Sequence, residues 1–538
     1  MTERKISRRS FITTSAMFGV AMALDWSKIN TLAAKIQTKK DLPVVVIGAG
    51  LGGLCCGALL AQRGFPVTVV EQHNIPGGYA TTFDRAGGKF TFDVSLHRMS
   101  VNRELQHLMK ELGISDKIEL VKIPNTHRVI TPNRDIRGAS GLKQKVNGLI
   151  EKFPHEKKGV ESYLAEMQAV VDELELLKTK GGGRNMASQY PKLWKIKDQT
   201  VAAFIDEYIR EPNIKESLTS GTMGSFGLPP SKLSAFIYIM AKASGENEQY
   251  YIKRRSQDLS YALAESIEES GGQIIYEKTI EKIVLKDRAV SGVVTSEGKH
   301  LPAKIVISNA NAITTLNNML PSETLPPDYM NRINGYGTSL STFVIWLGLN
   351  REIHEYIKDS HIVISSARGH EANYLSCLRG EVEKVDVSAM IYDNYYKGYS
   401  KPGSSTVTII TLGGIQPWQR FESDYKAGRK LGYLKEKERW AGILMKKVEE
   451  KAIPGLSSMV EVMEAATPLT NWRYTLNPGG AIYGFDFSVD NSFMNRIKNR
   501  TPVKGLYLAS AWGNAGGGYA PGLKGGERTF EKVLEDLT

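Results

Sequence analysis

The stretch LPVVVIGAGLGGLCCGALLAQRGFPVTVVEQHNIPGG, Leu42 to Gly78, decides how the rest of this chain is read. Its apolar run Val44–Ile47 predicts a buried parallel strand, because it is too short for a helix. The run ends in a G-x-G-x-x-G turn made by Gly48, Gly50 and Gly53. In such a turn the glycines allow a tight bend, a close approach of a pyrophosphate and close packing of helix on strand.

The elements after this turn have the spacing of a dinucleotide site. A helix over residues 51–63 would point its first amides at an anion. Val67–Val70 predicts a second strand, and Glu71 at its tip, 23 residues after Gly48, can accept the ribose hydroxyls of an adenosine. The alternative is a glycine-rich turn in an unrelated α/β unit. Two neighbours complete the contacts expected at this end: Ala49 and Gln72.

A second glycine pair, Gly77-Gly78, follows Glu71 by six residues. A pair at this distance lets the chain run beside the same pyrophosphate, which suits a cofactor buried along its whole length. The stretch resembles the FAD fingerprint of the two-dinucleotide-binding flavoproteins. FAD rather than NAD is therefore the expected cofactor.

The residues after the glycine pair, GGYATTFDRAGGKFTFDVSLHRMS, resemble the N-terminal signature of the phytoene desaturase, carotenoid isomerase and retinol saturase family. That family has a phrase similar to F-D-x-G-x-H, which here runs from Phe92 through Asp93 to His97. Tyr79 departs from desaturases and amine oxidases, which usually carry an arginine after the glycine pair. Retinol saturase-like and isomerase-like members also lack that arginine, so the resemblance leans toward them.

Later motifs of the same family occur in the right order. The resemblance implies a strand over the adenine with Ile280 as a contact, a phrase similar to S-N-A-D-P at residues 308–311, and a substrate-domain motif at residues 467–484. Relatives usually show glycines where Arg254 and Arg255 stand. A glycine-rich turn at residues 513–522 precedes a last helix and offers amides to the electron-rich end of a flavin. The contacts expected there are Gly517, Gly518 and Tyr519.

These motifs predict an α/β protein: a Rossmann-like FAD-binding domain, as in amine oxidases, with an interleaved α+β substrate domain. At 538 residues the chain is too long for one core. We assign residues 41–100, 250–311 and 500–538 to the FAD-binding domain and residues 101–249 and 312–499 to the substrate-binding or lid domain.

The N-terminus reads as a targeting segment. Ser7-Arg8-Arg9-Ser10-Phe11-Ile12 matches a twin-arginine signal, and a modestly apolar run too short to span a bilayer follows it. A chance basic tail and a short membrane-surface helix are the alternatives. We assign residues 1–34 to this signal, outside the fold, with weak cleavage candidates at residues 21–23 and 32–34. The resulting location is periplasmic or peripherally membrane-associated, or cytoplasmic if the signal is not used.

The charge and the cysteine content limit the kinds of partner and ligand that we expect for this chain. The net charge is +12, of which residues 1–40 carry half, with eight Lys and Arg against two acids. The remaining mildly basic surface is compatible with anionic lipid headgroups, while the absence of a basic motif with interleaved aromatics argues against nucleic acid. Cys55, Cys56 and Cys377 show no metal-ligand spacing and are expected to be small buried hydrophobes.

A flavin accepts or returns a hydride without a protein nucleophile, so no triad or metal cluster is required. Catalytic side chains remain unknown, with three weak candidates: His97, Asp93 and Lys253. The leading hypothesis is saturation or desaturation of a carbon–carbon double bond in a long apolar isoprenoid or polyene. The alternatives are cis–trans isomerisation of a polyene and a lipid or prenyl carrier without FAD. An exported enzyme would need a quinone or redox protein as electron partner, or oxygen.

Overall fold

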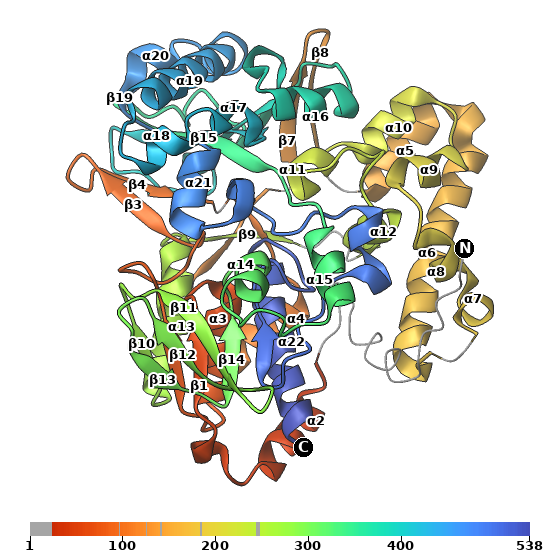
Figure 1. Cartoon of the computed structure of the whole chain (residues 1–538). Coiled ribbons are helices and arrows are strands. Elements are labelled where there is room, and N and C mark those ends of the chain that lie inside the picture. Colours follow the sequence, from red (N-terminus) through yellow and green to blue (C-terminus); the bar gives the residue numbers. More distant parts are fainter. Residues whose placement is uncertain (1–23, 96, 125, 140–141, 183–184, 244–247) are drawn as a thin grey trace.

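The computed structural model describes residues 24–95, 97–124, 126–139, 142–182, 185–243 and 248–538. Figure 1 shows these residues arranged around two large sheets, with a block of helices to one side. Neither sheet is built from one continuous stretch of chain, so segments far apart in the sequence meet in each.

The first sheet is parallel throughout and has the order β10-β2-β1-β14-β20. Because its strands run the same way, their carboxyl ends lie at one edge, where ligands bind in open α/β sheets. This sheet confirms the predicted Rossmann-like α/β fold. Its strands all come from segments that the sequence analysis assigned to FAD binding: β1 Val44–Ile47, β2 Val67–Val70, β10 Gln273–Ile275, β14 Ile305–Ser308 and β20 Leu506–Leu508.

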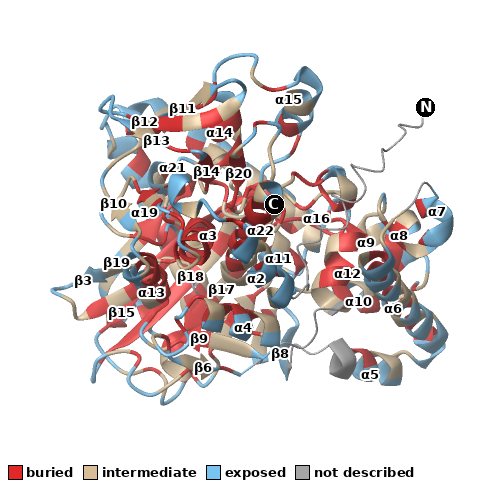
Figure 2. Ribbon diagram, turned by 90° about the horizontal axis from the view of Figure 1, so that it is seen from below, coloured by how far each residue is buried: buried red, intermediate tan, exposed pale blue. Residues whose placement is uncertain are grey.

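The alternation of β1 side chains explains how this sheet is covered on both faces. Val44 and Val46 pack into a core shared with α3 (Leu51–Ala61), α13 (Ser256–Glu269) and α22 (Tyr519–Leu537). Val45 and Ile47 pack on the other face, against the three-stranded sheet β11 (Ile280–Lys286), β12 (Ala289–Thr295) and β13 (His300–Pro302). Two-sided burial is what an all-apolar parallel strand requires; Figure 2 shows α3 and α22 deep in the red interior.

Two helices of the segment assigned to the substrate domain pack on the cofactor half. These are α14 (Ala312–Asn317) and α15 (Pro327–Asn334), whose buried residues Leu316 and Ile333 share the core of β11 and β12. The chain therefore leaves the cofactor half after α15 rather than at residue 311.

The second sheet has the order β19-β15-β18-β17-β16-β7-β8 and is antiparallel except where β16 meets β7. β15 lies between β19 and β18 and is buried along its whole length. Its strands are β7 Thr126–Thr131, β8 Arg134–Ala139, β15 Ser341–Leu349, β16 His361–Ile364, β17 Val387–Ile391, β18 Ser405–Gly413 and β19 Val460–Ala466.

Helices cover this sheet on its outer face (Figure 1). The longest of them, α19, buries Trp440, Leu444 and Val448 against it and exposes most of its charged residues. The covering helices are α16 His370–Arg379, α17 Gln416–Gln419, α18 Glu422–Lys426, α19 Leu431–Lys451 and α20 Leu456–Met459, and α21 (Pro468–Thr475) leads back toward the cofactor half.

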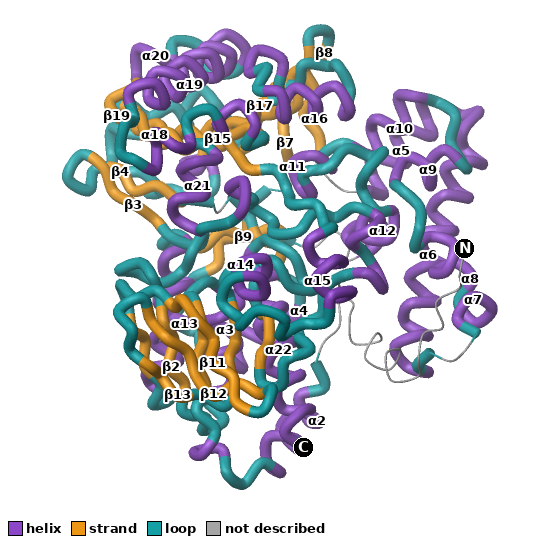
Figure 3. Tube along the Cα trace, in the orientation of Figure 1, coloured by secondary structure: helices purple, strands orange, loops and turns teal. Residues whose placement is uncertain are grey.

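The region inserted between β8 and β9 in the sequence is helical, as Figure 3 shows in purple. It has a core of its own around Tyr163, Leu193 and Tyr238. Its helices are α5 Leu142–Lys152, α6 Lys157–Lys180, α7 Met186–Gln189, α8 Pro191–Ile196, α9 Val201–Asp206, α10 Pro212–Thr219, α11 Thr222–Phe226 and α12 Ala235–Ala243.

Short elements join the halves. They are the hairpin β3 Thr82–Arg85 and β4 Phe90–Asp93, the small sheet β5 Met99–Ser100, β9 Gln249–Ile252 and β6 Leu120–Lys122, and the helix α4 Arg103–Glu111.

The N-terminal boundary differs from the sequence assignment. Residues 1–34 were expected to lie outside the fold, but Trp26–Lys35 forms helix α2, capped by Asp25 and buried through Ile29 and Ala33. The guanidinium of Arg63 lies 5.3 Å from the Trp26 ring, which holds the helix against the cofactor half. Helix α2, which the sequence assignment had placed almost wholly in the signal segment, therefore belongs to the folded protein. The twin-arginine motif lies outside the described residues.

Candidate cofactor-binding site

The first glycine turn lies at the carboxyl edge of the parallel sheet. Gly48 has φ +92°, a left-handed conformation that favours glycine, and Gly50 is the N-cap of α3 with no side chain capping the helix. The amide of Gly53 donates to Asn309 Oδ1 at 3.1 Å, so β14 fixes the turn. The open amides at the helix start are the group that binds a pyrophosphate.

Glu71 lies where the sequence placed it, directly after β2, and is 5% exposed. Its Oε2 accepts the amide of Ala49 at 2.6 Å and its Oε1 accepts the amide of His73 at 2.9 Å. The carboxylate thus ties the end of β2 to the first glycine turn. Its neighbour Gln72 points away, because its amide donates to the carbonyl of Tyr474 at 3.1 Å.

The segment before β11 runs beside the same acid. The amide of Lys278 donates to the carbonyl of Glu71 at 3.0 Å, and the amide of Glu277 donates to the carbonyl of His73 at 3.1 Å. Ile280 opens β11 two residues later and is buried. The expected adenine contact at Ile280 therefore lies next to the expected ribose acceptor, and both assignments stay predictions.

The second glycine pair packs directly on the first turn. The amide of Gly77 donates to the carbonyl of Ala49 at 2.7 Å, and a bridge pairs Gly77 with Gly50. A Cβ on Gly78 would lie 3.6 Å from Gly50 Cα. The two glycine segments are thus side by side, as one pyrophosphate contacted by both would require.

The C-terminal glycine turn meets this region from the other end of the chain. Gly518 is the N-cap of α22 and has no side-chain cap, so this helix also starts with open amides. The hydroxyl of Tyr519 donates to the carbonyl of Tyr79 at 3.3 Å, which joins the turn to the residue after Gly78. A Cβ on Gly517 would lie 2.6 Å from Tyr483 Cα, so the turn is also pressed against the substrate half.

The helices of the two turns pack closely where they cross, and the Cys55 thiol of α3 donates to the carbonyl of Leu523 in α22 at 3.2 Å. A Cβ on Gly526 of α22 would lie 2.4 Å from the carbonyl oxygen of Gly52 in α3. A Cβ on Gly52 would lie 1.7 Å from the carbonyl oxygen of Ala509. This close crossing brings both open helix starts to one edge of the sheet, and the arrangement fits a long dinucleotide such as FAD.

Asp93 is 1% exposed and works as a structural anchor in this arrangement. Its Oδ1 accepts the amide of Ser256 at 2.9 Å and the Ser256 hydroxyl, and its Oδ2 accepts the Tyr251 hydroxyl. Burial raises the pKa of Asp93, and these hydrogen bonds oppose that shift. Asp93 thereby fixes the start of α13.

Arg255, where relatives usually show glycine, adopts φ +78° and is the N-cap of α13. Its Nε donates to the carbonyl of Thr91 at 3.1 Å and its Nη2 to the carbonyl of Tyr399 at 3.0 Å. The guanidinium lies 3.9 Å from the centre of the Tyr399 ring, a cation–π contact. These contacts offset the strain of a left-handed arginine.

His97 lies beside the same aromatic cluster. Its Nδ1 is 2.8 Å from the Tyr392 hydroxyl, and the Tyr395 hydroxyl donates to its carbonyl at 2.9 Å. Burial lowers the pKa of His97 to about 4, and the nearby charge of Arg98 adds to the shift. The imidazole is therefore neutral near pH 7 and suits orienting a ring or passing a proton.

Lys253 is not brought to this cluster. Its side chain is 43% exposed, and its Nζ lies 2.6 Å from Glu119 at the surface. Of the three catalytic candidates, the structure places Asp93 and His97 with the aromatic cluster and Lys253 away from it.

The cluster itself was not identified from sequence. Tyr251, Tyr392 and Tyr399 pack with ring centres 5.1 to 5.8 Å apart. Two observations could have indicated it: the arginine at position 255 and the tyrosine-rich stretch of residues 392–399. Neither reveals which rings meet, because the contacts join β9 to the segment after β17.

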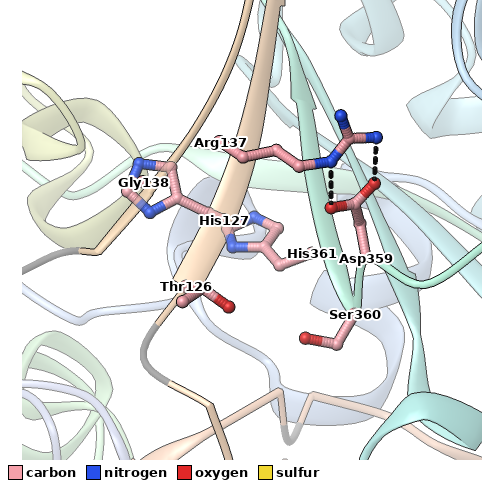
Figure 4. Close-up of a pocket in the computed structure, with 7 residues that line it drawn as sticks. All are labelled: Thr126, His127, Arg137, Gly138, Asp359, Ser360 and His361. Atoms are coloured by element: carbon pink, nitrogen blue, oxygen red, sulfur yellow. Dashed lines mark hydrogen bonds and ion pairs between the residues drawn. The ribbon is translucent and has the colours of Figure 1, made fainter.

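A separate polar pocket of about 300 Å³ opens between β7, β8 and β16 (Figure 4). Arg137 and Asp359 form a two-bond ion pair there, at 2.9 and 3.0 Å. His361 on its wall accepts through Nδ1 from the guanidinium of Arg98 at 2.6 Å, and Arg98 directly follows His97. Because its charged groups pair with one another, we assign this pocket no ligand.

The fold and the paired glycine turns define a flavoprotein of the two-dinucleotide-binding class. A family model described as "Flavin containing amine oxidoreductase" matches residues 51–523. The chain belongs to this family. It is an FAD-dependent oxidoreductase, which confirms the predicted cofactor and enzyme class.

Curated relatives match over most of their length. The chain is 26% identical to all-trans-retinol 13,14-reductase of Danio rerio over 511 residues, which cover 89% of this chain and 83% of the relative. It is 25% identical to the chloroplastic prolycopene isomerase of Arabidopsis thaliana over 506 residues, which cover 89% and 81%. The resemblance to retinol saturase-like and carotenoid isomerase-like proteins is thus confirmed.

Solved structures show the same fold. An oxidoreductase from Methanosarcina mazei superposes with a TM-score of 0.60 at 16% identity, covering 92% of this chain and all of that one. Cyclohexylamine oxidase from Brevibacterium oxydans gives 0.60 at 15% identity, with 92% and 99% covered. Among the helices that the structure describes, none has the length and apolar character needed to cross a bilayer.

Proposed function

We propose that this enzyme saturates or desaturates a carbon–carbon double bond in a long apolar isoprenoid or polyene. The observation that carries the proposal is the near full-length similarity to a retinol 13,14-reductase and to prolycopene isomerases, joined to a cradle that fits FAD. Tyr79 supports it, because the position after the glycine pair holds no charge.

The residues have separable tasks in this proposal. The glycine turns and Glu71 hold the dinucleotide, and Asp93 with Arg255 fixes the segment that joins the cofactor half to the substrate half. Bound FAD supplies the chemistry, taking a hydride from carbon or returning one. The neutral imidazole of His97 is suited to orient the ring or relay a proton next to an apolar substrate.

Cis–trans isomerisation is the second candidate, because prolycopene isomerases are among the similar relatives. It involves no net redox change, so the two candidates differ in what happens to the flavin. A carrier without FAD is not proposed, since a carrier has no need for the paired glycine turns.

An anaerobic titration separates the candidates. We expect retinol-type or carotenoid-type polyenes either to bleach the oxidised yellow protein, which indicates desaturation, or to restore the colour of the chemically reduced protein, which indicates saturation. Geometric isomers formed without any colour change would indicate isomerisation. If neither the absorbance nor the polyene changes with any tested compound, the polyene proposal fails.

We further propose export by the twin-arginine route, peripheral contact with anionic lipid, and a quinone or redox protein as electron partner. The supporting observations are the motif at residues 7–12 and the basic balance of residues 1–40. Cell fractionation of the wild-type chain and of a variant with both arginines changed to lysine tests this. We expect the wild type outside the cytoplasm and the variant inside; equal cytosolic retention of both would contradict export.

A further inference from the structure

Helix α2 packs one apolar face into the cofactor half. Ile29, Ala33 and Ile36 are 1%, 4% and 8% exposed, and they share a core with β1, α3 and the C-terminal helix α22. Leu24, just before the N-cap Asp25, also packs on this core. The three buried positions are separated by four and then three residues, so a single face of the helix makes the contact.

The first turn of α2 is held by residues of three other helical segments. The Trp26 ring stacks on the His107 ring of α4 at 5.8 Å and on the Phe530 ring of α22 at 6.5 Å. Arg63, just after α3, lies over the Trp26 ring, and its Nη2 donates to Asn30 Oδ1 at 3.3 Å. The surface that α2 docks on therefore forms only when α3, α4 and α22 have come together.

This docking bears on residues 32–34, one of the two cleavage candidates at the N-terminus, because they lie inside α2. A peptidase binds its substrate as an extended chain, so these residues would first have to unwind. Unwinding would withdraw Ala33 and Ile29, which lie on the same helix face, from the core. The twin-arginine route carries proteins that have already folded, so α2 would reach the peptidase docked and helical.

We infer that residues 32–34 are not a processing site, and that the exported protein keeps α2 as a strap that fastens α22. Cleavage there would remove Trp26 and Ile29 and would uncover Phe530, on which the Trp26 ring stacks. Because α22 begins at the C-terminal glycine turn, the strap also supports one end of the FAD site. The processing step rests on the export proposed above, whereas the docking of α2 is a property of the fold.

The intact mass of the exported full-length protein tests the processing step. We expect the wild type and S27E to begin no later than Leu24, because Ser27 lies on the exposed face of α2. I29E places the same charge at a buried position, so α2 should undock, and we expect trimming at residues 32–34. Exported wild type that begins at Lys35, or exported I29E that keeps α2, would overturn the inference. If the wild type is not exported at all, the export proposal fails instead.

Amide hydrogen exchange of the purified, FAD-bound, full-length protein tests the strap without export. A helix of 10 residues is marginal in water by itself, so protection of the α2 amides has to come from its packing. We expect these amides to exchange slower by a factor of about ten or more in the wild type and S27E than in I29E.

The temperature at which heating releases the flavin provides a second readout of the strap. It should be about 5 °C lower in I29E than in S27E, because α22 then lacks the support of α2. Equal exchange or an equal release temperature in the two variants would overturn the strap. A wild type without bound FAD would overturn the cofactor assignment instead, so the two failures are distinguishable.

Discussion

Residues 48–78 and residues 79–97 are neighbours in sequence and in space, yet they are built by different means. In the first region backbone groups make the contacts: the Gly77 amide donates to the Ala49 carbonyl, and Gly78 packs on Gly50. One carboxylate, that of Glu71, accepts the Ala49 amide. In the second region the contacts are made by side chains from distant segments: the Asp93 carboxylate accepts from the Ser256 amide and the Tyr251 hydroxyl. Backbone geometry leaves a local sequence motif, whereas a cluster of side chains does not.

The largest expected effect comes from adding one methyl group at the start of α3, where the helix packs on the segment after β20. In G52A the new Cβ would meet the carbonyl oxygen of Ala509, and backbone cannot move aside cheaply. We expect a loss of about 3 kcal/mol of unfolding free energy, with little FAD retained, measured by urea unfolding and flavin absorbance.

The control for this change is G442A, because Gly442 lies inside the exposed face of α19 with nothing within 4 Å of a new Cβ. Alanine there should stabilise the protein by up to about 1 kcal/mol. Equal stability of both variants would show that α3 does not pack on the segment after β20 as tightly as described.

The next effect tests the carboxylate that joins the glycine turns. E71Q removes the charge that accepts the amides of Ala49 and His73. Charge-assisted hydrogen bonds contribute about 1.5–3 kcal/mol, so the FAD Kd should rise roughly ten- to hundredfold, as measured by flavin fluorescence. Q72A is the matched control, because Gln72 faces Tyr474. If Q72A weakens FAD as much as E71Q, the assignment of Glu71 is wrong.

The third effect is a pH dependence of the unfolding free energy that comes from His97, in the second of the two regions. His97 has a pKa of about 4 in the folded state against about 6.5 unfolded, so the unfolded chain binds more protons between these values. Stability should therefore fall as pH drops from 6.5 to 4, with His97 contributing about 2–3 kcal/mol of the loss. Urea unfolding of wild type and H97Q across this range measures it, and parallel curves for the two proteins would contradict a buried neutral imidazole.

The smallest effect is expected at Lys253. Its ion pair with Glu119 is exposed on both sides, and such pairs contribute about 0–1 kcal/mol. K253A should leave the flavin spectrum, turnover and stability nearly unchanged. A large loss of turnover with an intact spectrum would return Lys253 to the list of catalytic candidates.

Much of the cofactor half could be predicted, because its signals are local. A strand, a glycine turn, a helix and an acid in fixed order specify β1, α3, β2 and Glu71 within forty residues. The helix α2 was missed although Trp26, Ile29 and Ala33 have helical spacing after the capping Asp25. The nearby signal motif led us to assign those residues to targeting.

The part of the site around Asp93 and His97 could not be predicted in the same way. Asp93 and His97 were identified through a resemblance, but their partners lie up to about three hundred residues away, at Tyr251 and Tyr392.

The most direct test of the central claim is the flavin content of the purified full-length protein. Two glycine turns that converge on one edge of the sheet predict a yellow protein with one FAD per chain, released intact as FAD on denaturation. G52A should lose that colour while G442A keeps it. A colourless wild-type protein that FAD does not reconstitute would contradict the account.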